Sequence, residues 1–71
     1  METDKDLLKS FGLKVQAKRK ELGLSQEELA FRAGFHRTYI GMIERAERNI
    51  TLSNMKRLAN ALQIGIKDFF I

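Results

Sequence analysis

Hydrogen-bond donors are concentrated in the stretch HRTYIGMIER, residues 36–45. Arg37 carries a guanidinium with five N–H donors, and Thr38 and Tyr39 add hydroxyl groups directly after it. Their spacing places all three on the first turn of a helix. A helix that only filled a core would not need these groups. They are suited to contacting a partner that is rich in hydrogen-bond acceptors.

Groups that could support catalysis or hold a metal are missing from the sequence. There are no cysteines, and His36 is the single histidine, so neither a disulfide framework nor a His/Cys metal site is expected. We find no Ser/His/Asp set, no phosphate-binding loop and no metal-binding cluster. We therefore expect no enzyme activity, no cofactor, no metal and no small-molecule ligand.

Length and charge favour one small domain with an anionic partner. The 71 residues suffice for a single domain, expected to span 1–71. The net charge is +4, of which residues 1–35 contribute +1 (seven basic, six acidic) and residues 36–71 contribute +3 (six basic, three acidic). A basic excess favours nucleic acid. No apolar run approaches the ~20 residues that span a bilayer, and the polar start METDKD is unlike a signal peptide. We expect a soluble cytoplasmic protein without membrane association.

The apolar residues recur with helical spacing in the first half of the chain. A first helix is expected over residues 6–22, closed by Gly23. The apolar residues that indicate it are Leu8, Phe11, Val15 and Leu22, which recur at spacings of three, four and seven. Ser25 and Glu28 form a capping box at the start of a second helix over residues 26–33. The buried stripe of that helix is expected to be Leu29, Ala30 and Ala33.

Helical spacing continues in the second half. A third helix is expected over residues 37–45, a fourth over 52–62 with Thr51 as its N-cap, and a short fifth over 66–70. The apolar positions of the fourth helix are Leu52, Met55, Leu58, Ala59 and Leu62, again at helical spacing. The predicted fold class is therefore all-α, a compact bundle of five helices joined by short connections.

The second and third helices are joined by a short turn that contains Gly34, as in a helix-turn-helix. A helical wheel of the third helix turns Ile40 and Ile43 inward. The outward positions are Thr38, Gly41, Met42 and Arg45. A helix that enters the major groove needs donors at its N-terminal end and small residues where its backbone comes close. Because Gly41 costs ~1 kcal/mol relative to alanine, we interpret it as a position of close approach.

The segment LSQEELAFRAGFHRTYIGMIERAERNITLSNMKRLANAL resembles the Cro/phage-repressor (XRE) family of lambda-repressor-like helix-turn-helix domains. The patterns S-Q-x-x-L-A, then G, then Y-I-x-x-I-E carry the likeness, which covers about residues 11–70. Within the family, RTYI, IER and RNIT resemble the controller proteins of restriction–modification systems. The resemblance implies a sequence-specific transcription regulator that binds double-stranded DNA at a two-fold operator as a homodimer.

The resemblance also implies roles at individual positions. The base-reading positions are Arg37, Thr38 and Met42. The positions implied to contact the DNA backbone are Ser25, Gln26, Tyr39, Arg45, Arg48 and Asn49. Two positions depart from the family pattern. Met42 stands where a polar residue is common, and Ala46 stands where glycine is frequent, so the turn after the third helix is expected to be less sharp.

An acid on this helix needs an explanation, because it would repel phosphate if it faced DNA. The wheel turns Glu44 inward beside Ile40, and a buried carboxylate requires a partner. Arg19 on the first helix is the natural candidate. In phage-repressor domains the matching positions form a buried ion pair, so the resemblance implies a structural Arg19–Glu44 pair.

The sequence ends in three apolar residues, which exceed what a terminal turn usually buries. One of them can complete the core, and the others favour a self-association surface. The candidate residues for a dimer interface are Ile50, Asn54, Phe69, Phe70 and Ile71.

Two other functions fit the same residues. An antitoxin of a toxin–antitoxin pair would also bind DNA and would need a surface for its toxin. A helical interaction module would have kept the fold and lost DNA binding, but the donors on the third helix argue against that loss. In the plainest interpretation, Arg48 and Arg57 are solvated charges.

Overall fold

The computed structural model describes the backbone of residues 2–70 and the side chains of residues 5–70. This part of the chain is helical and contains no strand. Its elements are α1 (Glu2–Glu21), α2 (Gln26–Ala33), α3 (Arg37–Glu44), α4 (Leu52–Ala61) and the 3-10 helix η1 (Ile66–Phe70). The all-α prediction is confirmed. None of these helices is long and apolar enough to cross a bilayer.

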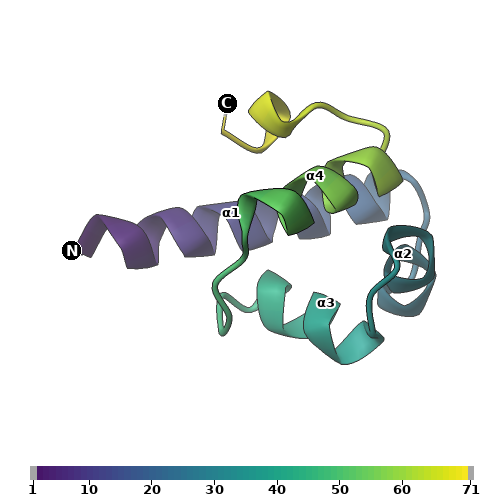
Figure 1. Cartoon of the computed structure of the whole chain (residues 1–71), viewed down its shortest axis with the longest axis horizontal. Coiled ribbons are helices and arrows are strands. Elements are labelled where there is room, and N and C mark those ends of the chain that lie inside the picture. Colours follow the sequence, from purple (N-terminus) through teal and green to yellow (C-terminus); the bar gives the residue numbers. More distant parts are fainter. Residues whose placement is uncertain (1, 71) are drawn as a thin grey trace.

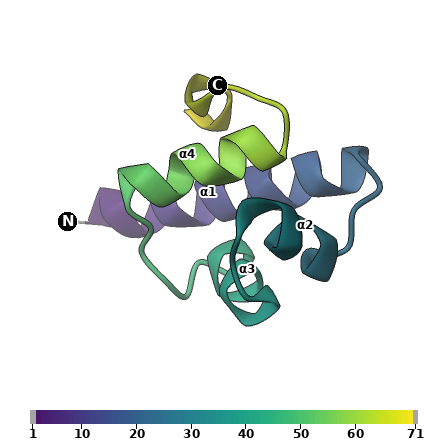
Figure 2. The same ribbon diagram turned by 45° about the vertical axis from the view of Figure 1, so that its right-hand side comes forward.

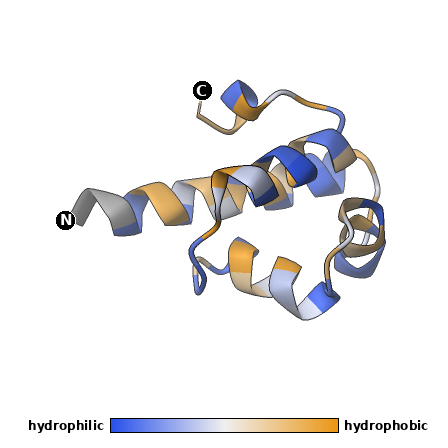
Figure 3. Cartoon of the chain, viewed as in Figure 1, coloured by the Kyte–Doolittle hydropathy of each residue, from blue (hydrophilic) through white to orange (hydrophobic). Residues whose placement is uncertain are grey.

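The helix α3 lies on one side of the molecule and η1 on the opposite side (Figures 1 and 2). α3 packs against α2 and α1, and α2 also contacts α4. η1 packs against α1 and α4. The arrangement leaves one long side of α3 without a packing partner among the described elements. In the hydropathy colouring, the N-terminal end of α3 is hydrophilic and its C-terminal half carries apolar residues (Figure 3).

The fifth element differs from the predicted α-helix. Five residues are too few for stable α-helical bonding, and the turn is a 3-10 helix, in which the Asp68 N–H donates to the Gly65 carbonyl oxygen at 3.0 Å. The Asp68 carboxylate in turn accepts from the Gly65 N–H at 2.9 Å. The turn carries Phe69 into the core against Phe11, with ring centroids 4.7 Å apart. The count of five α-helices is therefore wrong.

Other boundaries shift by a few residues. α1 begins at Glu2 and ends at Glu21, whereas the sequence predicts residues 6–22. α3 and α4 each end one residue earlier than predicted, because Arg45 and Leu62 are their C-caps. α2 has the predicted bounds, and both halves of its capping box are present.

Two leucines that follow the helical spacing lie at the surface. Leu22 is 40% exposed, because α1 stops before it and the chain turns at Gly23, and Leu24 is buried instead. Leu52 is 69% exposed as the first residue of α4. The remaining core follows the helical spacing. Its fully buried large side chains are Val15, Leu29, Ile40, Ile43, Leu58, Leu62 and Phe69.

The turns on either side of α3 are fixed by backbone conformation. Gly34 has a φ of 79° and ends α2 in the left-handed region that favours glycine. After α3, Ala46 has a φ of 61°, also in the left-handed region. The expectation of a less sharp turn at Ala46 is therefore wrong. The alanine adopts the glycine-like conformation at a cost of about 1 kcal/mol.

Gly12 allows α3 to approach α1 closely. A Cβ atom at this position would lie 2.5 Å from the Ile43 carbonyl oxygen and 2.8 Å from that of Glu44. Real Cβ atoms do not come this close, so a side chain here would push the end of α3 away. The close crossing brings Glu44 to the part of α1 that carries Arg19.

Candidate nucleic-acid interface

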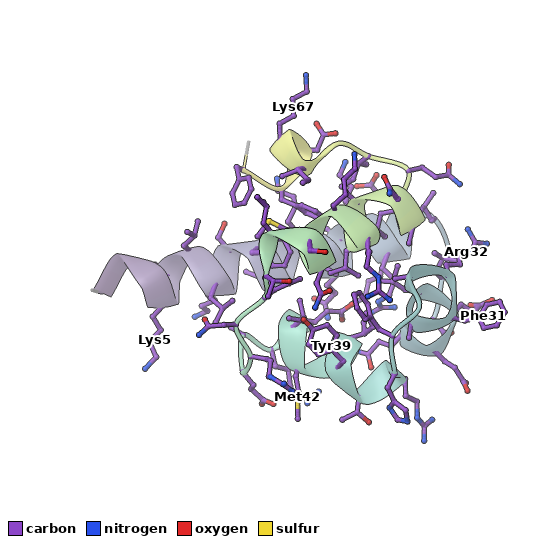
Figure 4. All side chains as sticks on the ribbon, in the orientation of Figure 1. Lys5, Phe31, Arg32, Tyr39, Met42 and Lys67 are labelled. Carbon is purple, nitrogen blue, oxygen red and sulfur yellow. The ribbon has the colours of Figure 1, made fainter. Side chains whose placement is uncertain are left out.

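Polar groups crowd the N-terminal tip of α3. Arg37 and Thr38 are exposed there, and the His36 Nδ1 accepts a hydrogen bond from the Thr38 N–H at 3.1 Å. This bond caps α3 and fixes the backbone that carries both exposed side chains. Met42, one turn further on, projects from α3 away from the body of the protein (Figure 4). The three residues predicted to read bases therefore all lie on α3.

The opposite side of α3 is held by a buried ion pair. The Arg19 Nε donates to the Glu44 Oε2 at 2.7 Å, and the Arg19 Nη2 donates to the Glu44 Oε1 at 3.0 Å. Only 9% of Arg19 and 7% of Glu44 is exposed. The hydrogen bond to Glu44 raises the pKa of Arg19, which keeps the arginine charged. The predicted pair is thus formed, and it joins α1 to α3.

Two further contacts extend this pair. The Arg19 Nη1 donates to the Leu24 carbonyl oxygen at 2.8 Å, in the turn before α2. The Gln26 Nε2 donates to the Glu44 Oε1 at 3.1 Å. One carboxylate on α3 therefore accepts three hydrogen bonds from α1 and α2. The Gln26 Nε2 keeps a second N–H for another acceptor.

Arg57 on α4 holds the turn between α2 and α3. Its Nε donates to the Ala33 carbonyl oxygen at 3.1 Å, and its Nη2 donates to the Gly34 carbonyl oxygen at 2.8 Å. The guanidinium also lies 4.2 Å from the centroid of the Phe35 ring. The interpretation of Arg57 as a solvated charge is wrong. No local pattern could have revealed this contact, because it joins residues more than twenty positions apart.

Tyr39 is half-buried at the junction of α3 and α4. Its ring packs on Phe35 with centroids 4.9 Å apart, and the Arg48 guanidinium lies 5.6 Å from its centroid. The Tyr39 Oη accepts a hydrogen bond from the Asn54 Nδ2 at 3.2 Å. Asn54, predicted at a dimer interface, thus joins α4 to α3. The tyrosine hydroxyl keeps its own proton for donation.

Arg45 folds back over α3. Its Nε and Nη2 donate to the two carboxylate oxygens of Glu47, at 3.0 and 3.2 Å. Gly41 is buried beneath it, since a Cβ atom at Gly41 would lie 3.0 Å from the Arg45 Nη1. The glycine predicted to allow a close approach is therefore covered by an arginine of its own chain.

The remaining candidates fall into two groups. Ser25, Arg48 and Asn49 are exposed, as backbone contacts require. For the dimer interface, Phe69 is 1% exposed and belongs to the core, which removes it from that set. Ile71 lies outside the described residues.

An apolar groove lies beside the C-terminal turn. Phe70 is 49% exposed and stacks on Phe11, with ring centroids 6.4 Å apart. The groove has a volume of about 210 Å³. It is lined by Leu7, Leu8, Phe11, Asn49, Ile50, Met55 and Phe70. Among the candidates for the dimer interface, Ile50 and Phe70 therefore share one surface.

Comparison with known proteins identifies the class. A helix-turn-helix family profile matches residues 15–69. The chain belongs to the helix-turn-helix family. Its relatives include control proteins and a helix-turn-helix transcriptional regulator. The predicted resemblance to this family is confirmed.

Three of the proteins to which the chain is similar are control or controller proteins. The chain is 46% identical over 59 residues to the control protein C.BamHI of Bacillus amyloliquefaciens, covering 82% of this chain and 73% of that protein. It is 52% identical over 52 residues to the control protein C.SmaI of Serratia marcescens, covering 73% of this chain and 62% of that protein. The crystal structure of the restriction–modification controller C.AhdI from Aeromonas hydrophila superimposes with a TM-score of 0.87 at 45% identity, covering 92% and 97% of the two chains.

Removal of Glu44 should destabilise the fold without removing an exposed group. We expect Glu44→Ala to lower the free energy of unfolding by about 3–5 kcal/mol, because Arg19 would be left buried without a counter-charge. Urea unfolding followed by circular dichroism measures this change. Should Glu44→Ala fail to fold, Glu44→Gln provides a milder substitution of similar size.

Glu21→Ala is the matched control. Glu21 pairs with Lys18 at 3.8 Å on the surface, so its removal should change stability little. Equal stability of Glu44→Ala and Glu21→Ala would show that the buried pair does not hold α3.

Proposed function

We propose that this chain is a sequence-specific transcription regulator that binds a two-fold DNA operator as a homodimer and controls a restriction–modification system. The observation that carries the proposal is the two-sided character of α3. Its inner side is fixed by the bonds to Glu44, whereas its N-terminal tip presents Arg37 and Thr38 to solvent. The similarity to C.BamHI, C.SmaI and C.AhdI supports the controller assignment.

In this proposal α3 enters the major groove with its N-terminal tip toward the base edges. Arg37 is suited to guanine, because the guanidinium can donate to O6 and N7 together. Thr38 offers a hydroxyl to a neighbouring base. Met42 lies one turn further along α3 and is suited to a thymine methyl group.

The DNA backbone is contacted from both sides of α3. Ser25 and Gln26 stand at the N-terminus of α2, where the helix dipole favours phosphate. Gln26 donates one amide N–H to Glu44 and offers the other to DNA. Tyr39 offers its hydroxyl proton. The cationic or polar side chains that follow α3 and complete the set are Arg45, Arg48 and Asn49.

The second copy is proposed to occupy the apolar groove at Ile50 and Phe70. Ile71 is kept as a candidate for the same interface. Such a surface is self-complementary about a two-fold axis. Two copies would then read half-sites about one helical turn apart, ~34 Å. Because its partner is the DNA of the cell, the protein is proposed to act in the cytoplasm.

Selection from a pool of random duplexes tests the DNA function without knowledge of the operator. The wild type should enrich a two-fold symmetric site. Arg37→Ala should then weaken binding to that site by ~1–3 kcal/mol and relax the preference at one base pair per half-site. Arg48→Ala should weaken binding to selected and random duplexes alike and reduce the salt dependence.

Arg37→Ala and Arg48→Ala are matched controls for each other, because each removes one arginine charge near α3 and only Arg37→Ala is expected to change sequence preference. An unchanged ratio of selected to random binding in Arg37→Ala would refute its assignment as a base reader. Failure of the wild type to enrich any sequence would refute the proposed function itself.

Sedimentation tests the dimer. We expect the wild type to be dimeric at micromolar concentration and Phe70→Ala to be shifted toward monomer, because the variant loses an exposed ring from the apolar groove. Phe31→Ala is the control. Phe31 is 86% exposed on α2, outside the groove, and its removal should leave the dimer intact. A wild type that stays monomeric at high micromolar concentration, with and without DNA, would contradict this proposal.

A further inference from the structure

Arg45 and Glu47 form a fixed unit on the outer side of α3. Both carboxylate oxygens of Glu47 accept from the same guanidinium, from Nε at 3.0 Å and from Nη2 at 3.2 Å. A two-point contact of this kind sets the plane of the guanidinium as well as its position. Arg45 lowers the pKa of Glu47, so the carboxylate remains charged at neutral pH.

The Arg45 guanidinium of this unit packs against the backbone of α3 at Gly41. The Arg45 Nη1 lies 3.0 Å and both Cζ and Nη2 lie 3.6 Å from the place that a Gly41 Cβ would take. The flat guanidinium therefore rests on Gly41. An alanine at position 41 would require the guanidinium to shift by a few tenths of an ångström.

The unit is exposed at the place where the proposed function puts DNA. The side chains of Arg45 and Glu47 are 57% and 52% exposed. Glu47 uses the Nε–Nη2 edge of the guanidinium, and both N–H groups of Nη1 and one of Nη2 point elsewhere. The cation can therefore donate to a phosphate while Glu47 still holds it.

A carboxylate beside a phosphate contact also has a cost. Glu47 lowers the positive potential of this surface and repels the DNA backbone. On random DNA, where contacts are loose and electrostatic, this repulsion is the main effect. At a site that fits α3, the held guanidinium meets its phosphate without loss of side-chain freedom, which offsets the repulsion.

We propose that Glu47 is a specificity-determining residue that positions Arg45 on Gly41 for one phosphate of a matched DNA site and weakens binding to all other DNA. The inference rests on the proposed DNA-binding function. It assigns a role to an acid outside the residues that touch DNA. It also gives Gly41 a function within the protein.

The test compares Glu47→Gln with the wild type on two probes, the duplex selected by the wild type and a random-sequence duplex of equal length. Glu47→Gln should bind the random duplex about two- to fivefold more tightly and change little on the selected duplex, so the ratio of selected to random affinity falls. A smaller fall is expected for Gly41→Ala, which keeps the charge of Glu47 and shifts the Arg45 guanidinium by a few tenths of an ångström.

Two controls separate positioning from charge alone. Asp6→Asn removes an equal charge from an exposed residue near the start of α1. The N-terminal end of α1 projects beyond α3 (Figure 1), so the affinity ratio of this variant should match that of the wild type. In an Arg45→Gln background, Glu47→Gln should no longer change the ratio. Thermal melts should show that Glu47→Gln is folded like the wild type.

The outcomes are distinct. The inference would be overturned if Glu47→Gln left the ratio of selected to random affinity unchanged. It would also be overturned if Glu47→Gln lowered this ratio equally in the wild type and in the Arg45→Gln background. Either result would leave the proposed function intact. A wild type that binds neither duplex would overturn both.

Discussion

A carboxylate that is buried on α3 constrains the rest of this fold. Glu44 would be strongly destabilising without donors, and it accepts three hydrogen bonds, two from Arg19 and one from Gln26. These bonds converge from α1 and α2 and leave α3 little freedom to rotate or slide. The close crossing at Gly12 is part of the same arrangement, because it brings the end of α3 within reach of Arg19. The pair need not add net stability in order to specify one orientation.

The fixed inner side of α3 allows its outer side to be polar. Arg57 holds the turn before α3, and Ala46 reverses the chain after it, so both ends of the helix are set by the domain. The donors at the N-terminal tip therefore stand on a rigid support, which is what the recognition of base edges requires. The contacts that we propose to the DNA backbone come from residues that surround this tip. The same division explains why one face of a short helix carries isoleucines and the other carries arginine and threonine.

The sequence predicts features that depend on local spacing, and long-range contacts account for the rest. Helical spacing and the Ser25–Glu28 capping box predict the helices, and the family resemblance adds the Arg19–Glu44 pair. Leu22 and Leu52 have the right spacing for burial but lie at helix ends, where spacing does not determine exposure. The placement of Phe69 in the core depends on a 3-10 turn that carries it back to Phe11. The contact between Gly41 and Arg45 depends on a side-chain conformation, which no pattern of residue types encodes.

Native-state hydrogen exchange tests most directly whether the bonds to Glu44 hold α3 in place. In the wild type, amides of α3 and the Leu58 amide of α4 should exchange with similar opening free energies, as parts of one cooperative unit. Arg19→Lys keeps the charge and removes the two-point contact to Glu44. It should lower the opening free energy of the α3 amides more than that of Leu58, because α3 would detach first. If the opening free energies of the α3 amides and of the Leu58 amide fall by equal amounts in this variant, the bonds to Glu44 do not determine the position of α3.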